Sequence, residues 1–208
     1  MEREEALKKL IKLEGRDLRQ LAEKNNITVW KNGRINKGWA GHAIERYLGL
    51  PINSSQSPNF GSWELKIVPL KYLRNHTLVV KETMAITMID DVNVCQKKFK
   101  DSHLYAKLRK MIVCARIFES KAEESSILVR VRSFDLNNLA LLKQIENDYE
   151  EVRRCIKENG FDYLSGRMGV FIQPRTKGAG HGTKSRAFYA RKNLVSHIIG
   201  LPTKNNIV

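Results

Sequence analysis

The segment Trp63-Glu64-Leu65-Lys66 holds two residues whose types and spacing could do phosphodiester chemistry. Residues two apart in a β-strand point to the same face, so Glu64 and Lys66 should project together and Leu65 into the opposite layer. A carboxylate can ligate Mg²⁺, a hard ion that prefers oxygen. A neighbouring ammonium can orient or help deprotonate the attacking water and steady charge on the phosphate. The pair is therefore a candidate for metal-assisted hydrolysis, although a surface ion pair explains most such pairs.

Two residues upstream bear on this hypothesis. A second acidic residue at the start of the preceding strand would strengthen it, and Asn59 occupies that place. Glu45 lies in a short apolar-faced segment just before the intervening loop. Taken alone, Glu45 is a surface glutamate near a helix end, which is the usual case.

The C-terminal part of the chain is strongly basic. From Gly166 to Val208 there is no acidic residue. The basic residues of this stretch are Arg167, Arg175, Lys177, Lys184, Arg186, Arg191, Lys192 and Lys204. Part of the run coincides with the glycine-rich segment TKGAGHGTKSR, where glycine lets backbone approach a phosphate closely and Lys and Arg neutralise it. This coincidence favours a nucleic-acid contact over an ordinary solvated surface.

Composition narrows the classes of protein. The 208 residues carry 37 Lys and Arg against 22 Asp and Glu, a formal charge of +15, and 42% are apolar, enough for a folded core. A folding chain with so large a positive charge is expected to bind a polyanion, most often nucleic acid. No apolar run approaches the roughly 20 residues of a membrane span, and the N-terminus MEREEALKK does not resemble a secretory signal. Three widely spaced cysteines argue against a disulfide scaffold or zinc ribbon, so we expect a cytoplasmic protein.

Periodicity predicts the elements that must position these residues. Helices are expected over 2–25 with a break at Gly15, over 38–49, and over 137–158, the longest. Strands are expected over 63–70, 77–89, 127–131 and 169–173. Residues 26–37, 50–60 and 174–186 indicate loops, whereas 103–118 and 187–199 mix helix and strand signals. The pattern favours a mixed α/β fold whose central sheet carries Glu64 and Lys66.

An ordered set of segments resembles a known family. GWAGHAIERYLG, SPNF and WELKIVP are followed by Ser102-His103 with Lys107, then by IENDYEEV, FIQPRTKGA and RAFYARKNL. From about residue 5 to residue 200, this order is similar to the catalytic domain of the MutH/Sau family of GATC-cleaving endonucleases, within the PD-(D/E)xK nuclease superfamily. The resemblance implies one restriction-endonuclease-like domain, 1–208, with a mixed sheet flanked by helices. It also implies two lobes forming a DNA cleft, a catalytic one over about 1–100 and a DNA-reading one over about 101–208.

The resemblance implies roles for the catalytic residues. Glu64 looks like a metal ligand, Lys66 the water-activating lysine, Glu45 an acid that reaches the metal through water, and Lys107 an auxiliary lysine near the scissile phosphate. The implied Mg²⁺ ligands are Asn59, Glu64 and Leu65. Asn59 stands where the family has aspartate, and an amide lacks the charge that makes hard-ion binding strong. We expect the chain as written to bind metal poorly and cut slowly, and we favour an engineered inactive form over a natural degenerate one because the other site positions are intact.

The resemblance also implies residues at the double-stranded DNA. Arg175 and Lys177 look like base- or backbone-reading residues, and the basic loop adds Lys184 and Arg186. Tyr189 resembles a tyrosine near the adenine whose methylation matters, and Glu82 an acidic residue in the same region. The expected state is a monomer in solution, with a dimer on DNA or an additional C-terminal domain left open.

Four functions remain as hypotheses. The first is a Mg²⁺-dependent type II restriction endonuclease, or its catalytic domain, that reads a short sequence such as GATC and attacks phosphorus in line. Its alternative is a MutH-like mismatch-repair nicking endonuclease. The third is a non-catalytic duplex-binding module in which Asn59 reflects lost activity. The last is a basic RNA-binding protein, which lacks an aromatic stacking motif of the RRM kind.

Overall fold

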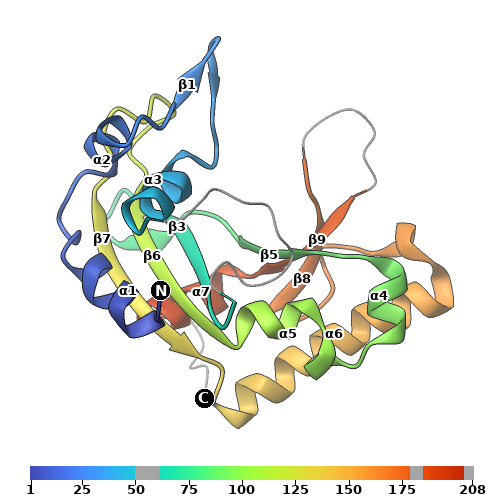
Figure 1. The fold of residues 1–208 in the computed structure, drawn as a ribbon. Helices are drawn as coiled ribbons and strands as arrows, with labels where there is room; N and C mark the ends of the chain where they lie inside the picture. Colours follow the sequence, from blue (N-terminus) through green and yellow to red (C-terminus); the bar gives the residue numbers. More distant parts are fainter. Residues whose placement is uncertain (50–60, 179–184, 204–208) are drawn as a thin grey trace.

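Two larger sheets, a two-stranded sheet and seven α-helices build the part of the chain that the computed structural model describes, residues 1–49, 61–178 and 185–203 (Figure 1). The helices are α1 (Arg3–Ile11), α2 (Leu18–Lys24), α3 (Trp39–Tyr47), α4 (Asp91–Gln96), α5 (His103–Leu108), α6 (Leu139–Asn159) and α7 (Lys192–Ile199), with short 3₁₀ turns at Phe99–Asp101 and Phe161–Tyr163. The strands are β1 (Trp30–Lys31), β2 (Arg34–Ile35), β3 (Glu64–Tyr72), β4 (Leu78–Val80), β5 (Met84–Met88), β6 (Lys110–Ile117), β7 (Leu128–Asp135), β8 (Ile172–Thr176) and β9 (Arg186–Ala190). A separate two-stranded ribbon pairs β1 with β2.

The central sheet has the order β4-β3-β6-β7 and contains both strand directions. β3 runs parallel to β6 and antiparallel to β4, and β6 runs antiparallel to β7. β6 is apolar along almost its whole length, as expected for a strand covered on both faces. The predicted mixed α/β fold, with a central mixed sheet flanked by helices, is confirmed.

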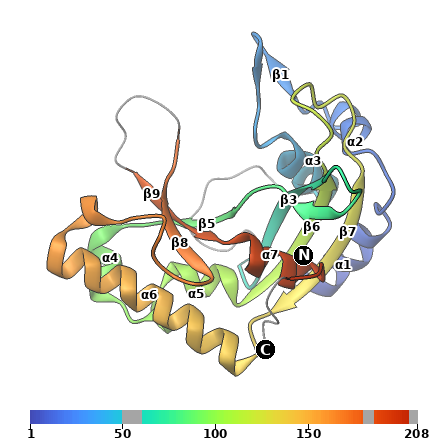
Figure 2. The same ribbon diagram turned by 180° about the vertical axis from the view of Figure 1, so that it is seen from behind.

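Alternating side chains of β6 divide the core between the two faces of this sheet. Ile112 and Cys114 pack with apolar residues of α1, α2 and α3. Met111 and Val113 pack on the other face, in a larger cluster with α5, α6, α7 and the second sheet. Figures 1 and 2 show α1 to α3 on one side of the central sheet and α7 on the other. The side chains of Glu64 and Leu65, at the start of β3, therefore point to opposite faces of the central sheet.

The second sheet, β5-β9-β8, is antiparallel throughout. The sequence predicted one strand over 77–89, but the structure has two. β4 ends at Val80 beside β3, and after a three-residue link β5 begins at Met84 beside β9. Both halves carry strand-forming residues, so the local pattern could not show that the chain changes sheets between them.

The two sheets do not follow the order of the chain. β5 precedes residue 100 yet pairs with β9, whereas β6 and β7 follow it yet extend the sheet of β3. The expected division into a catalytic lobe over 1–100 and a DNA-reading lobe over 101–208 therefore does not match the strand pairing. Both sheets draw on residues from each side of that boundary.

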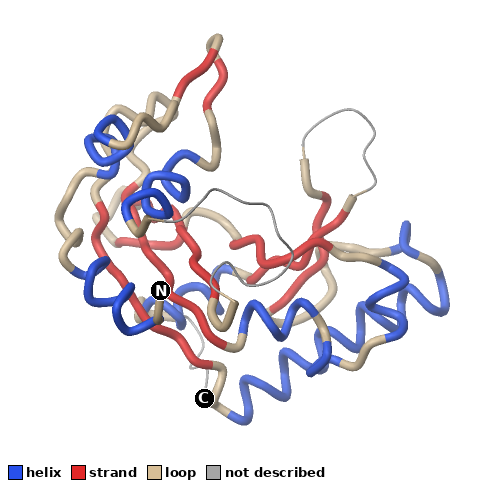
Figure 3. Tube along the Cα trace, viewed as in Figure 1, coloured by secondary structure: helices blue, strands red, loops and turns tan. Residues whose placement is uncertain are grey.

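Other elements also differ from expectation (Figure 3). The predicted loop at 26–37 contains the β1–β2 hairpin, whose turn Asn32-Gly33 has positive φ at both positions, as a tight hairpin turn requires. The mixed signals over 103–118 and 187–199 each resolve into two elements, α5 with β6 and β9 with α7. The strand expected at 169–173 begins only at Ile172. The loop expected at 50–60 lies outside the described residues.

Among the described helices, none has the combination of length and apolar character that crossing a bilayer requires.

Candidate catalytic cavity and nucleic-acid interface

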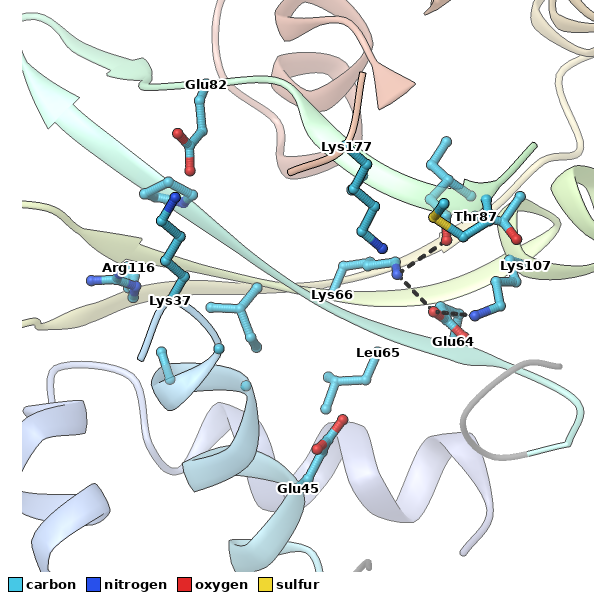
Figure 4. A pocket seen from close by; sticks show the side chains of 18 residues that line it. Lys37, Glu45, Glu64, Leu65, Lys66, Glu82, Thr87, Lys107, Arg116 and Lys177 are labelled. Atoms are coloured by element: carbon cyan, nitrogen blue, oxygen red, sulfur yellow. Dashed lines mark hydrogen bonds and ion pairs between the residues drawn. The ribbon is translucent and has the colours of Figure 1, made fainter. Parts of the chain in front are cut away.

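The Glu64 carboxylate lies between two lysine side chains. Glu64 and Lys66 share one face of β3, as alternation predicts, and Lys66 Nζ is 2.7 Å from Glu64 Oε1. Lys107 Nζ, from α5, lies 3.4 Å from the same oxygen. Glu64 is only 1% exposed, so its charge is balanced by these two ammonium groups rather than by bulk water. Figure 4 shows the three side chains converging from β3 and α5.

Lys107 reaches this position because α5 begins just before β6. Ser102 caps the helix by accepting a hydrogen bond from the backbone N–H of Tyr105, and the helix ends directly before the strand that pairs with β3. The Lys107 side chain is 8% exposed. Burial lowers the pKa of Lys107, Glu64 opposes that shift, and the positive charges of Lys66 and Lys177 reinforce it.

Leu65 and Glu45 lie together on the other side of β3. Leu65 is buried in the cluster that α3 covers. Glu45 extends from α3 toward Leu65, away from the Glu64–Lys66 face (Figure 4). Both still line the same cavity as Glu64. The structure thus brings Glu45 to the rim of the site, on the opposite side of the strand from the two lysines.

A cavity of about 430 Å³ connects these residues to the second sheet. Besides the residues above, its charged lining comprises Lys37, Glu82, Arg116 and Lys177. Lys177 enters from just beyond β8, and Figure 4 shows its side chain directed toward Lys66. Positive charge therefore predominates around the Glu64 carboxylate, as a site for a phosphate group requires.

The second cavity lies between β3 and the β5-β9-β8 sheet and gathers three of the expected DNA-reading residues. Arg175, Tyr189 and Glu82 line it. The Arg175 guanidinium lies 5.8 Å from the centre of the Tyr189 ring and donates a hydrogen bond to Thr83 Oγ1 at 2.9 Å. Burial raises the pKa of Tyr189, Arg175 counteracts this, and Glu82 adds to it. Tyr189 therefore presents a protonated hydroxyl near neutral pH.

Arg186 lies apart from both cavities. It pairs across the sheet with Thr176, so both point to the face opposite that of Arg175. Its guanidinium donates to Thr176 Oγ1 at 3.1 Å and to the Asp162 carbonyl at 3.2 Å, over the Phe161 ring. These contacts tie β9 to the 3₁₀ turn after α6. Asn59 and Lys184 lie outside the described residues.

Two charged residues of the cavity lining were not expected from the sequence. Lys37 is the residue before the GWAGHAIERYLG segment, and this adjacency was the only signal for it. Arg116 is on β6, where a cation that follows five apolar residues could have drawn attention. It makes two hydrogen bonds to Glu123, at 2.6 and 3.0 Å, and one to Ser126 Oγ at 2.8 Å. This pairing neutralises Arg116.

The oxygen donors of the cavity suit Mg²⁺ better than a soft metal. No three His, Cys, Asp or Glu side chains are grouped to hold an ion in the ranges 1–49, 61–178 and 185–203. Three carboxylates, Glu45, Glu64 and Glu82, line the cavity, and Glu45 and Glu64 come from α3 and the start of β3. Mg²⁺ is commonly held by one or two carboxylates while it keeps several waters, so this set fits such an ion in its donor chemistry.

Comparison with known proteins identifies related sequences. Residues 48–148 match the family model "DNA mismatch repair enzyme MutH". A DNA mismatch repair protein MutH from Haemophilus ducreyi is 28% identical over 219 aligned positions, covering 94% of this chain and 92% of the relative. The MutH of Vibrio campbellii is 28% identical over 179 positions, covering 84% and 76%. A solved structure titled "Restriction endonuclease MvaI-cognate DNA substrate complex" aligns with a TM-score of 0.36 and 14% identity, covering 86% of this chain and 94% of that one.

Proposed function

We propose that the chain is a member of the MutH family, which its match to the family model over residues 48–148 and its similarity to MutH proteins over most of their length support. We propose further that it is a Mg²⁺-dependent endonuclease that cuts double-stranded DNA at a short sequence such as GATC. The observation that carries the proposal is the buried Glu64 carboxylate, held by Lys66 at 2.7 Å and Lys107 at 3.4 Å in a cavity rich in positive charge. A buried carboxylate with two lysines serves no packing purpose that apolar residues would not serve as well.

The residues of the cavity have different roles in the proposed phosphodiester hydrolysis. Glu64 is the principal ligand of the ion and Glu45 supports it through water, with Asn59 and the Leu65 backbone as further ligands. When bound, Mg²⁺ would supply positive charge at the phosphate and make water a stronger acid. Lys66 orients the attacking water and takes part in its deprotonation. Lys107, whose pKa is lowered by burial, lies on the other side of Glu64 and is assigned to the phosphate oxygens.

The mismatch-repair hypothesis is better supported than the restriction hypothesis. The curated relatives cited above are mismatch repair proteins, and they match this chain over most of their length. We therefore propose that each encounter cuts one strand, since one chain contains one Glu64–Lys66 pair. Arg175, Tyr189 and Glu82 are proposed to read base edges, which would give the sequence preference.

Cleavage of supercoiled plasmid tests the proposal. Asn59→Asp restores the charge expected at the metal site, so this variant should nick plasmid containing GATC when Mg²⁺ is added, and the chain as written should cut at least tenfold more slowly. Asn59→Ala is the matched control, because it removes the amide oxygen without adding charge, and it should be inactive. Methylated and unmethylated plasmids should be compared in parallel.

The products separate the hypotheses. Open circles that accumulate before linear DNA support a nicking enzyme, and linear DNA formed without open circles supports the restriction hypothesis. Tight binding of duplex DNA with no cleavage by Asn59→Asp, in any divalent metal ion, would show that the chain is a binding module and the endonuclease proposal is wrong.

A further inference from the structure

Lys177 is held in a defined place by the backbone of the second sheet. Its N–H donates to the carbonyl of Ser185 at 3.0 Å, which continues the β8–β9 pairing one step beyond Thr176 and Arg186. The Cα of Lys177 is thus fixed by the ladder, and only its side chain is free to move.

Lys177 and Arg175 share a face of the sheet but line different cavities. Residues two apart project together, so both point toward β3. Arg175 contacts Thr83 and Tyr189 in the second cavity. Lys177 lines the cavity of Glu64, and its side chain is directed toward Lys66 (Figure 4). Arg175 and Lys177, which lie two residues apart at the end of β8, therefore face different cavities.

The charge around Lys177 is unbalanced. Glu64 is engaged by Lys66 and Lys107, and Arg116 is neutralised by Glu123. Among the described residues, the Lys177 ammonium makes no hydrogen bond or ion pair. It is close enough to the site to lower the pKa of Lys107. The cavity is lined by five cationic side chains and three carboxylates, so positive charge is in excess and an anion that enters would lower the electrostatic energy of the empty cavity.

We propose that Lys177 binds the backbone phosphate that is cut, so that the β5-β9-β8 sheet contributes a catalytic residue directly to the cavity of Glu64. This inference rests on the proposed endonuclease function. It assigns Lys177 to a phosphate oxygen and leaves base reading to Arg175. Cleavage would then require that the β5-β9-β8 sheet is seated on DNA, since Lys177 reaches the phosphate only from that sheet.

Methylphosphonate scanning tests the contact without requiring cleavage. Short duplexes containing GATC carry one neutral methylphosphonate at successive positions, and binding is measured at fixed salt with the chain as written and with Lys177→Ala. At one position the neutral linkage should weaken binding by the chain as written about tenfold and by Lys177→Ala less than twofold. Lys157→Ala, which removes the same charge from α6 and lines neither cavity, should keep the full penalty.

The position of that phosphate decides the proposal. It should be the phosphate cut by Asn59→Asp, mapped separately on the same duplex. Equal penalties for both proteins at every position, or a Lys177-dependent phosphate away from the cut bond, would overturn it. A loss of base-pair preference in Lys177→Ala without a phosphate effect would do the same and would assign Lys177 to base reading. Failure of the endonuclease proposal shows itself differently, as DNA that is never cut by Asn59→Asp.

Discussion

Lys66 on β3 donates a hydrogen bond from Nζ to the carbonyl oxygen of Ile86 on β5, at 3.4 Å. The lysine that is 2.7 Å from the Glu64 carboxylate therefore also contacts the second sheet. This contact fixes the ammonium at the junction of the two sheets, so a change in their relative position would move the group that we propose activates water.

Removal of the Lys66 ammonium should abolish cleavage but not binding. In the Asn59→Asp background, Lys66→Ala should lower the single-turnover rate about 100-fold or more, because general-base and positioning groups typically contribute that much. The affinity for uncut duplex should change less than threefold, since most affinity comes from other phosphate contacts. Rates from labelled duplex and affinities from fluorescence anisotropy measure both. Cleavage that survives would mean that the active site is elsewhere.

The pKa of Lys107 should respond to its neighbours with opposite signs. Burial lowers it, Glu64 raises it and Lys177 lowers it. Glu64→Gln should therefore lower the pKa of Lys107 further, and Lys177→Ala should raise it toward the ordinary lysine value. The midpoint is measured from the Lys107 side-chain resonance in metal-free protein during an NMR pH titration. A shift of the same sign in both variants would contradict the arrangement of charges around Glu64.

Arg175 should control discrimination between sequences. Arg175→Ala should reduce the preference for the target over a duplex with one base pair changed by roughly 1–3 kcal/mol, the value of a good base contact. Thr83→Val retains the guanidinium and removes its 2.9 Å hydrogen bond, so it should have a smaller effect. Competition binding against both duplexes gives the ratio. An equal loss of affinity for target and variant would assign Arg175 to the DNA backbone.

A close approach at Gly169 should make that residue intolerant of a side chain. Gly169 has φ of +74°, and a Cβ there would overlap the carbonyl oxygen of Ile172. Gly169→Ala should destabilise the protein by more than ~3 kcal/mol. Gly15→Ala is the control, because Gly15 has φ of +81° but open space around it, so only the backbone strain of about 1–2 kcal/mol should appear. Urea unfolding measures both, and equal losses would exclude the overlap.

The tight turn at Gly169 is organised by one buried carboxylate. Asp148 on α6 is 1% exposed and accepts hydrogen bonds from the backbone N–H groups of Val170, Phe171 and Ile172, at 2.7 to 2.8 Å. These bonds explain why β8 begins at Ile172 and not at the residue expected from the sequence. A carboxylate in the middle of a helix pattern gives no indication that it will cap a turn far along the chain.

Local periodicity predicted what depends on neighbours in sequence. Alternation placed Glu64 and Lys66 on one face of a strand, and the apolar spacing of residues 137–158 indicated the long helix α6. The positions of Lys107 and Lys177 depend on strand pairing between distant segments. Only the resemblance to a family suggested Lys107 for the site, and the sequence did not indicate that Lys177 and Arg175 would enter different cavities.

The crossing of the chain between the two sheets has a consequence for fragment complementation. A nick in the backbone near residue 100 would separate β3, β4 and β5 from β6, β7, β8 and β9, so the central sheet would be divided between β3 and β6 and the second sheet between β5 and β9. In either piece alone, a strand edge would expose backbone N–H and C=O groups without hydrogen-bond partners. Each piece should therefore be insoluble when it is expressed by itself. Co-expressed, the two pieces should reassemble through both sheets at once, which makes this position suitable for a split reporter.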